Sequence, residues 1–236
     1  LDKAKTIIQN SSPIFLPEKK IYLSEILFKK AVALIQTHKY AEAIQNLNNY
    51  IAEKQSRVKL SEALFWLAES YYRSDLLKNA QKTYQTLLDS FPQFRREEVL
   101  YGIGWAYFRD KNFKKSSGFF ETLTNEFPKS KFAVEVLARQ ADGYYIEKNY
   151  AKAAQFYEQA AKLEPKSEEG QYCAYQLCHA LYRNGQLDKS VDALLNFVGK
   201  YPNSQYAPNA VYLIGWIKFN QKQYSEAINN YSYLIE

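Results

Sequence analysis

Residues 100–107 read LYGIGWAY, and residues 111–128, after a short polar link, read KNFKKSSGFFETLTNEFP. Two small residues, Gly104 and Ser116, stand twelve positions apart, and Pro128 follows twelve positions later. Large apolar residues flank each small residue at three or four positions, which is the spacing of one face of a helix. A proline cannot continue the helical hydrogen-bond ladder. The stretch therefore predicts two amphipathic helices joined by a turn and closed by a proline.

The same pattern recurs along the chain with a period of 36 or 37 residues. The small residue of the first half is Ala31, Ala68, Gly104, Ala141, Cys178 or Gly215, and that of the second half is Ala43, Ala80, Ser116, Ala153, Ser190 or Ala227. Small residues at these points let two helices cross closely. One helix pair has two apolar faces and cannot bury both by itself, so six such units predict a stack of repeats.

These repeats resemble the tetratricopeptide repeat (TPR) family, most fully from Leu100 to Pro128. The resemblance implies an all-α fold, a right-handed α-solenoid (superhelix) of antiparallel helix-turn-helix units. The sequence departs from the family pattern in three respects. Its period is about 37 rather than 34, Lys218 stands where the other units carry Leu or Tyr, and the inner-turn glycine survives only as Gly185.

The proline series sets the expected boundaries of the units. They are residues 1–20 (the second helix of an upstream repeat plus a linker), 21–57, 58–92, 93–128, 129–165, 166–202 and 203–236. Residues 1–4 mimic residues 187–190 at the start of a second helix, and the last unit stops inside a second helix without a polar cap. Because solenoids need capping repeats, we expect the array to continue beyond both ends.

The link from Tyr201 to Ala210 is similar to that of a bacterial cell-envelope subgroup of TPR proteins, which includes the Tol-Pal-associated coordinator and the BamD-type assembly lipoprotein. This resemblance implies the bacterial cell envelope, with the periplasm foremost, and leaves the cytoplasm open.

Composition argues against several classes of partner. The net charge is +6, but the basic residues alternate with acidic ones along the chain, which does not favour nucleic-acid binding. Apolar runs are far shorter than the roughly 20 residues that span a bilayer, so we expect no membrane insertion of this chain. Cys173 and Cys178 lie five residues apart on one expected helix, too far for a disulfide, and are expected to be free and buried.

No catalytic, cofactor or metal site is expected. His179 follows Cys178 directly, and adjacent helical residues point in different directions, which does not suit a nucleophile and its base. No metal-ligand spacing joins Cys173, Cys178 and His179. Gly102 and Gly104 lack the third glycine of a dinucleotide fingerprint and fall inside a helix, where they indicate close packing.

A second stripe on the first helices, one position from the core stripe, is mostly aromatic. The resemblance implies that it lines a concave groove that holds a peptide or partner protein. The candidate groove residues are Phe65, Glu69, Arg73, Tyr101, Trp105, Arg109, Asp142, Tyr175, His179, Arg183, Tyr212 and Trp216. Packing between repeats is the alternative for the aromatic residues, and salt-bridge ladders are the alternative for the arginines.

The leading functional hypothesis is a non-catalytic protein-binding scaffold, tested most directly at Trp105 and Tyr175. Two other hypotheses stay open, a structural spacer or self-assembling array that associates through its ends, and a regulatory arm of a larger multidomain protein. The Lys-Asn carboxylate clamp of chaperone-binding TPR proteins is absent from the matching positions, so no chaperone tail is expected as the ligand.

Overall fold

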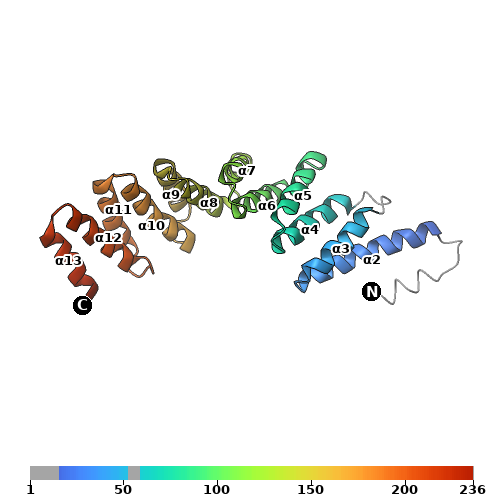
Figure 1. The fold of residues 1–236 in the computed structure, drawn as a ribbon, viewed down its shortest axis with the longest axis horizontal. Helices are drawn as coiled ribbons and strands as arrows, with labels where there is room; N and C mark the ends of the chain where they lie inside the picture. Colours follow the sequence, from blue (N-terminus) through green and yellow to red (C-terminus); the bar gives the residue numbers. More distant parts are fainter. Residues whose placement is uncertain (1–15, 53–58, 236) are drawn as a thin grey trace. The chain divides into compact units, whose positions relative to one another are not determined.

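The computed structural model describes residues 16–52 and 59–235, and these residues form twelve helices and no strand (Figure 1). The prediction of an all-α fold is confirmed. The chain divides into two compact units between Phe119 and Phe120, and each unit is described by itself.

The first unit contains α2 (Leu16–Gln36), α3 (Tyr40–Ala52), α4 (Leu60–Arg73), α5 (Leu77–Ser90), α6 (Arg96–Arg109) and the first half of α7 (Phe113–Glu126). The second unit contains the rest of α7, α8 (Ala133–Ile146), α9 (Tyr150–Leu163), α10 (Glu168–Arg183), α11 (Leu187–Lys200), α12 (Ala207–Asn220) and α13 (Tyr224–Ile235).

Helices pack in chain order within each unit, and first helices also contact first helices. In the first unit α2 packs against α3, α3 against α4, α4 against α5 and α5 against α6. In the second unit α8 to α13 follow the same succession (Figure 1). The contacts of α2 with α4, α4 with α6 and α8 with α10 place the first helices of successive pairs side by side. This is the arrangement of stacked helical hairpins.

The helix boundaries differ from the expected ones at the beginning of the chain. Helix α2 begins at Leu16, within the segment assigned to an upstream remnant and linker. The upstream helix expected in residues 1–10 and the link at residues 53–58 lie outside the described residues. Elsewhere the prolines at 92, 128, 165 and 202 all follow the end of a second helix, as their missing N–H group requires.

Close crossings explain the small residues. Ala68, Ala80 and Ala153 are fully buried in the cores of their units. At Gly102 a Cβ atom would lie 2.6 Å from the ring of Tyr84 on α5, so a side chain at this position would displace that ring. The interpretation of this glycine as a packing residue, not a nucleotide-binding one, agrees with its position.

The inner turns share one backbone conformation even though only one of them contains glycine. The residue with positive φ is His38, Asp75, Lys111, Lys148, Gly185 or Lys222. After α4, Asp75 N–H donates to the Tyr72 carbonyl and Leu76 N–H donates to the Tyr71 carbonyl. This pair of bonds is the Schellman motif, which satisfies carbonyls at the end of a helix and favours glycine at the residue with positive φ. The turn is therefore preserved at the expense of backbone strain in five of its six copies.

Candidate partner-binding surface

The stripe that the sequence assigned to an open groove is partly buried. Phe65 on α4 is only 6% exposed and Tyr175 on α10 only 9% exposed. The expectation that this level of the stripe is open to a ligand is wrong for these two residues. Substitution of Trp105 and Tyr175 therefore does not test an accessible surface at both positions.

A residue of the following repeat covers this level of the stripe. It stands just before the first helix of that repeat or in the first turn of that helix. The guanidinium of Arg95 lies 4.9 Å from the ring centre of Phe65. The ring of Tyr206 stacks on Tyr175 at 5.0 Å with an interplanar angle of 13°. Lys59 lies 5.5 Å from the ring centre of Phe28 in the same manner. Cation–π and stacking contacts of this kind stabilise the joint between one repeat and the next.

Sequence reasoning missed these covering residues, although a signal for them exists. Positions 59, 95, 132, 169 and 206 follow the same 36- or 37-residue period as the small residues. Three of them are Lys59, Arg95 and Tyr206, whose contacts with the stripe have just been described.

The two carboxylates of the stripe bind tyrosine hydroxyl groups of their own repeats. The Tyr84 hydroxyl donates to Glu69, and the Tyr157 hydroxyl donates to Asp142 Oδ1 at 2.6 Å. Burial first, and then the adjacent carboxylate, raises the pKa of each of these tyrosines, so both phenols stay protonated and act as donors. Glu69 and Asp142 thus have a structural role.

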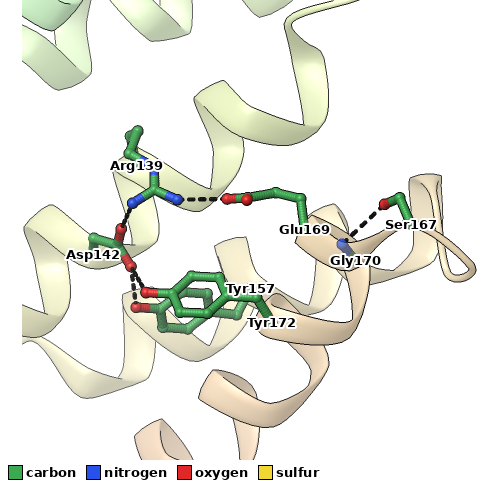
Figure 2. Close-up of polar contacts among 7 residues, drawn as sticks. All are labelled: Arg139, Asp142, Tyr157, Ser167, Glu169, Gly170 and Tyr172. Atoms are coloured by element: carbon green, nitrogen blue, oxygen red, sulfur yellow. Dashed lines mark hydrogen bonds and ion pairs between the residues drawn. The ribbon is translucent and has the colours of Figure 1, made fainter. Parts of the chain in front are cut away.

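Asp142 is the centre of a larger network that joins two repeats (Figure 2). Its Oδ1 also accepts from the Tyr172 hydroxyl at 2.8 Å, and its Oδ2 accepts from Arg139 at 2.5 Å. Arg139 in turn donates to Glu169 of α10 at 2.5 Å. Ser167 caps the start of α10 by accepting from Gly170 N–H at 3.0 Å (Figure 2). No pattern in the sequence singles out Arg139 or Tyr172.

Two of the three candidate arginines bind the preceding repeat, which favours the ladder interpretation. Arg109 donates to Asp75 at 2.8 Å and to the Tyr72 carbonyl at 3.2 Å, and its guanidinium lies 4.9 Å from the ring centre of Tyr72. Arg183 donates to the Tyr150 hydroxyl at 3.1 Å. Arg73 is exposed at the end of α4.

In the first unit, the aromatic residues of α6 form a half-buried row. The rings of Tyr101 and Trp105 are 6.3 Å apart, and those of Trp105 and Phe108 are 5.5 Å apart. Edge-to-face contacts fix these rings against one another. The row presents only part of its surface to solvent.

In the second unit, α12 carries three exposed aromatic side chains. Tyr212 is 55% exposed, Trp216 41% and Phe219 50%. The Trp216 indole N–H donates to the Tyr182 hydroxyl of α10 at 3.1 Å, which holds the indole in place. We call Tyr182, Tyr212, Trp216 and Phe219 the α12 aromatic patch. Tyr212, Trp216 and Phe219 recur at helical spacing, so they share one face of α12, which Tyr182 adjoins from α10.

His179 lies on α10, between Tyr175 and Tyr182 in the stripe. Its ring meets Tyr175 edge-on at 4.6 Å, and burial lowers its pKa. The imidazole is therefore neutral at physiological pH and behaves as a packing group.

The two cysteines are free and buried, as expected. Burial raises the pKa of both Cys173 and Cys178 to about 12. A thiol with such a pKa is almost wholly protonated at neutral pH and is a poor nucleophile or metal ligand. Among the described residues, no three His, Cys, Asp or Glu side chains are grouped so as to hold a metal ion.

In the part of the chain that the structure describes, no helix combines the length and the apolar character needed to cross a bilayer.

Comparison with known families gives two matches. The family model of the soluble NSF attachment protein, SNAP, matches residues 109–234, which are 126 of the 236 residues. The tetratricopeptide repeat model matches residues 62–93. A search of curated proteins found no match.

Solved structures with the same fold come from several bacteria. The C-terminal part of a TPR repeat-containing protein from Cytophaga hutchinsonii is 17% identical, with a TM-score of 0.70, over 88% of this chain and 78% of that one. A TPR protein from Parabacteroides merdae is 16% identical, with a TM-score of 0.66, over 91% and 79% of the two chains. MamA from Desulfovibrio magneticus is 15% identical, with a TM-score of 0.59, over 74% and 93%. At these identities the likeness establishes the fold alone.

Proposed function

The chain belongs to the family that the soluble NSF attachment protein (SNAP) model describes, and from this premise we propose that it is a non-catalytic scaffold that binds a peptide or partner protein through the α12 aromatic patch. Its repeats also match the tetratricopeptide repeat model over residues 62–93. Repeats of this kind generally mediate protein–protein interaction. The exposure of Trp216 and Phe219 and the bond that holds the Trp216 indole against Tyr182 are the observations that support this site.

Exposed aromatic side chains are unfavourable in water when they cluster, and clusters of this kind mark partner sites. Trp and Tyr are enriched among the residues that contribute most to binding, because each combines a large apolar surface with a polar group. The bond from Trp216 to Tyr182 restrains the indole before any partner arrives, so binding loses less side-chain entropy.

The other candidate residues contribute less to this proposal. Phe65 and Tyr175 are covered, Glu69 and Asp142 bind tyrosines, and Arg109 and Arg183 bind the preceding repeat. Tyr101 and Trp105 remain a half-buried second candidate in the first unit. A place in the bacterial cell envelope is part of the proposal and rests on the resemblance of the link at residues 201–210.

Affinity capture from an extract of the native cells tests the proposal. The parent chain and a Tyr212→Ala/Trp216→Ala variant are immobilised side by side. The matched control is Leu195→Ala/Tyr233→Ala, which removes two exposed side chains from α11 and α13, outside the patch.

We expect a protein that the parent and the control retain and that the patch variant loses by at least tenfold. Circular dichroism should show the same helical content for all three chains, because the substituted side chains are exposed. Equal retention by the patch variant would rule out the patch as the binding site.

A further inference from the structure

A groove runs along the second unit between the second helices α9 and α11. Both helices pack on α10, which forms the floor of the groove. Two adjoining cavities of about 530 and 380 Å³ occupy it, and both are lined by Glu158 and Leu177. On the α9 side the lining extends from Ala151 to Pro165, which corresponds to about 20 Å at 1.5 Å per helical residue.

Small apolar residues keep this groove open. Ala154, Ala161, Ala174 and Ala193 line it, and none of them is long enough to fill the space between α9 and α11. The α10 residues on the floor, such as Leu177, are on a different face of that helix from Tyr182 of the aromatic patch, since residues five apart diverge by about 140°. The groove is thus a second surface, separate from the patch.

The walls and floor determine which backbone can occupy the groove. The N–H and C=O groups of α9, α10 and α11 are bonded within their own helices, except at the helix ends. An extended segment in the groove would bury peptide groups that find no partner there, and each such group is costly. A helix satisfies its own peptide groups and presents apolar side chains to the floor.

Charged side chains along α11 add a specific pattern. Lys189, Asp192 and Lys200 are exposed and line the groove in this order, three and eight residues apart. On the opposite wall Glu158 stands near the middle, and Lys162, which it binds at 2.6 Å, lies toward the Lys200 end. The groove is therefore basic at both ends and acidic in the middle.

We propose that this groove docks an amphipathic helix of a partner protein, with an apolar stripe toward α10 and with acidic, basic and acidic side chains placed against Lys189, Asp192 and Lys200. Complementary charge selects the partner and sets its direction in the groove, while burial of the stripe contributes most of the affinity. This surface does not rest on the function proposed for the aromatic patch.

A synthetic 18-residue helical peptide tests this inference. It carries Leu and Ala on one face, Glu, Lys and Glu at positions i, i+3 and i+11, and Gln elsewhere. The charge-inverted peptide has Lys, Glu and Lys at the same three positions, and each sequence is also made in reversed order to allow for either direction. Binding to the whole chain is measured by fluorescence anisotropy at low and high salt.

We expect the Glu–Lys–Glu peptide, in one of the two directions, to bind at least tenfold more tightly than its inverted counterpart at low salt. The difference should shrink at high salt, because exposed charges are screened. A Lys189→Glu/Asp192→Lys/Lys200→Glu variant should reverse the preference. The three side chains are exposed, so the variant should keep its helical content.

Trp216→Ala is the control that separates this inference from the proposed function. It should leave peptide binding unchanged, whereas loss of binding would place the peptide on the aromatic patch and overturn the inference. Failure of all four peptides to bind, equal binding of the two charge patterns, or indifference to the triple charge variant would also overturn it.

Discussion

At Lys148 the backbone has a φ of 62°, a conformation that costs an L-residue with a side chain about 1–2 kcal/mol. Lys148→Gly removes this strain and adds about 0.5–1 kcal/mol of backbone entropy loss on folding. We therefore predict a net gain of about 0.5–1 kcal/mol in the free energy of unfolding, measured by urea denaturation.

Gly185→Lys is the matched control, since Gly185 occupies the same turn position with a φ of 76° and an added Cβ would meet nothing within 4 Å. It should destabilise the chain by a similar amount. A loss of stability in Lys148→Gly would show that the side chain of Lys148, not its backbone, determines the energy of this turn.

Single residues of the stripe also show where sequence reasoning stops. The spacing assigned Phe65 and Tyr175 to a stripe one position from the core stripe, but it could not show that Arg95 and Tyr206 cover them. Burial depends on a neighbour from the next repeat, and periodicity within one helix contains no information about that neighbour. Comparison of position 95 with its equivalents one period away would have suggested the contact.

At the scale of helices, Asp142 joins α8, α9 and α10 through Arg139, Tyr157 and Tyr172. Asp142→Ala leaves two phenols and a half-buried guanidinium without this acceptor, although Arg139 keeps Glu169. We predict a loss of about 2–3 kcal/mol in the free energy of unfolding, below the full cost of breaking a buried ion pair because one partner remains.

Tyr157→Phe is the comparison for this prediction. It removes one hydroxyl and one hydrogen bond and should cost about 1 kcal/mol. Both variants are measured in the same thermal and urea denaturation experiments. If Asp142→Ala cost no more than Tyr157→Phe, the network would not act as a joint between these helices.

The sequence contains a rule that links the first and second helices of a repeat. Glu69 and Asp142 occur in repeats whose second helix carries the buried Tyr84 or Tyr157, whereas the repeat with Trp105 has Phe120 at that position. Tyr231, in the repeat with Trp216, is only partly buried and needs no acceptor from that repeat. A buried hydroxyl needs an acceptor and a phenylalanine does not. This pairing could have been recognised from the sequence alone, and it would have removed both carboxylates from the list of groove residues.

For the whole chain, the period of small residues and prolines was sufficient to predict the all-α repeat fold, because a helical repeat is determined by local spacing and by contacts between neighbouring units. The accessible surface was predicted less well. Of the residues named from the stripe, Tyr212 and Trp216 are the aromatic ones that lie open, and the groove between α9 and α11 left no pattern in the sequence that we recognised.

Site-specific photo-crosslinking from position 216 in living cells tests whether a partner binds at the α12 aromatic patch. A benzophenone amino acid replaces Trp216 in one chain and Tyr233 in another, both at exposed positions. We expect a discrete crosslinked partner from position 216 and none from position 233. A partner crosslinked from position 233 alone, or from neither position while the protein still functions, would contradict the assignment of binding to the α12 aromatic patch.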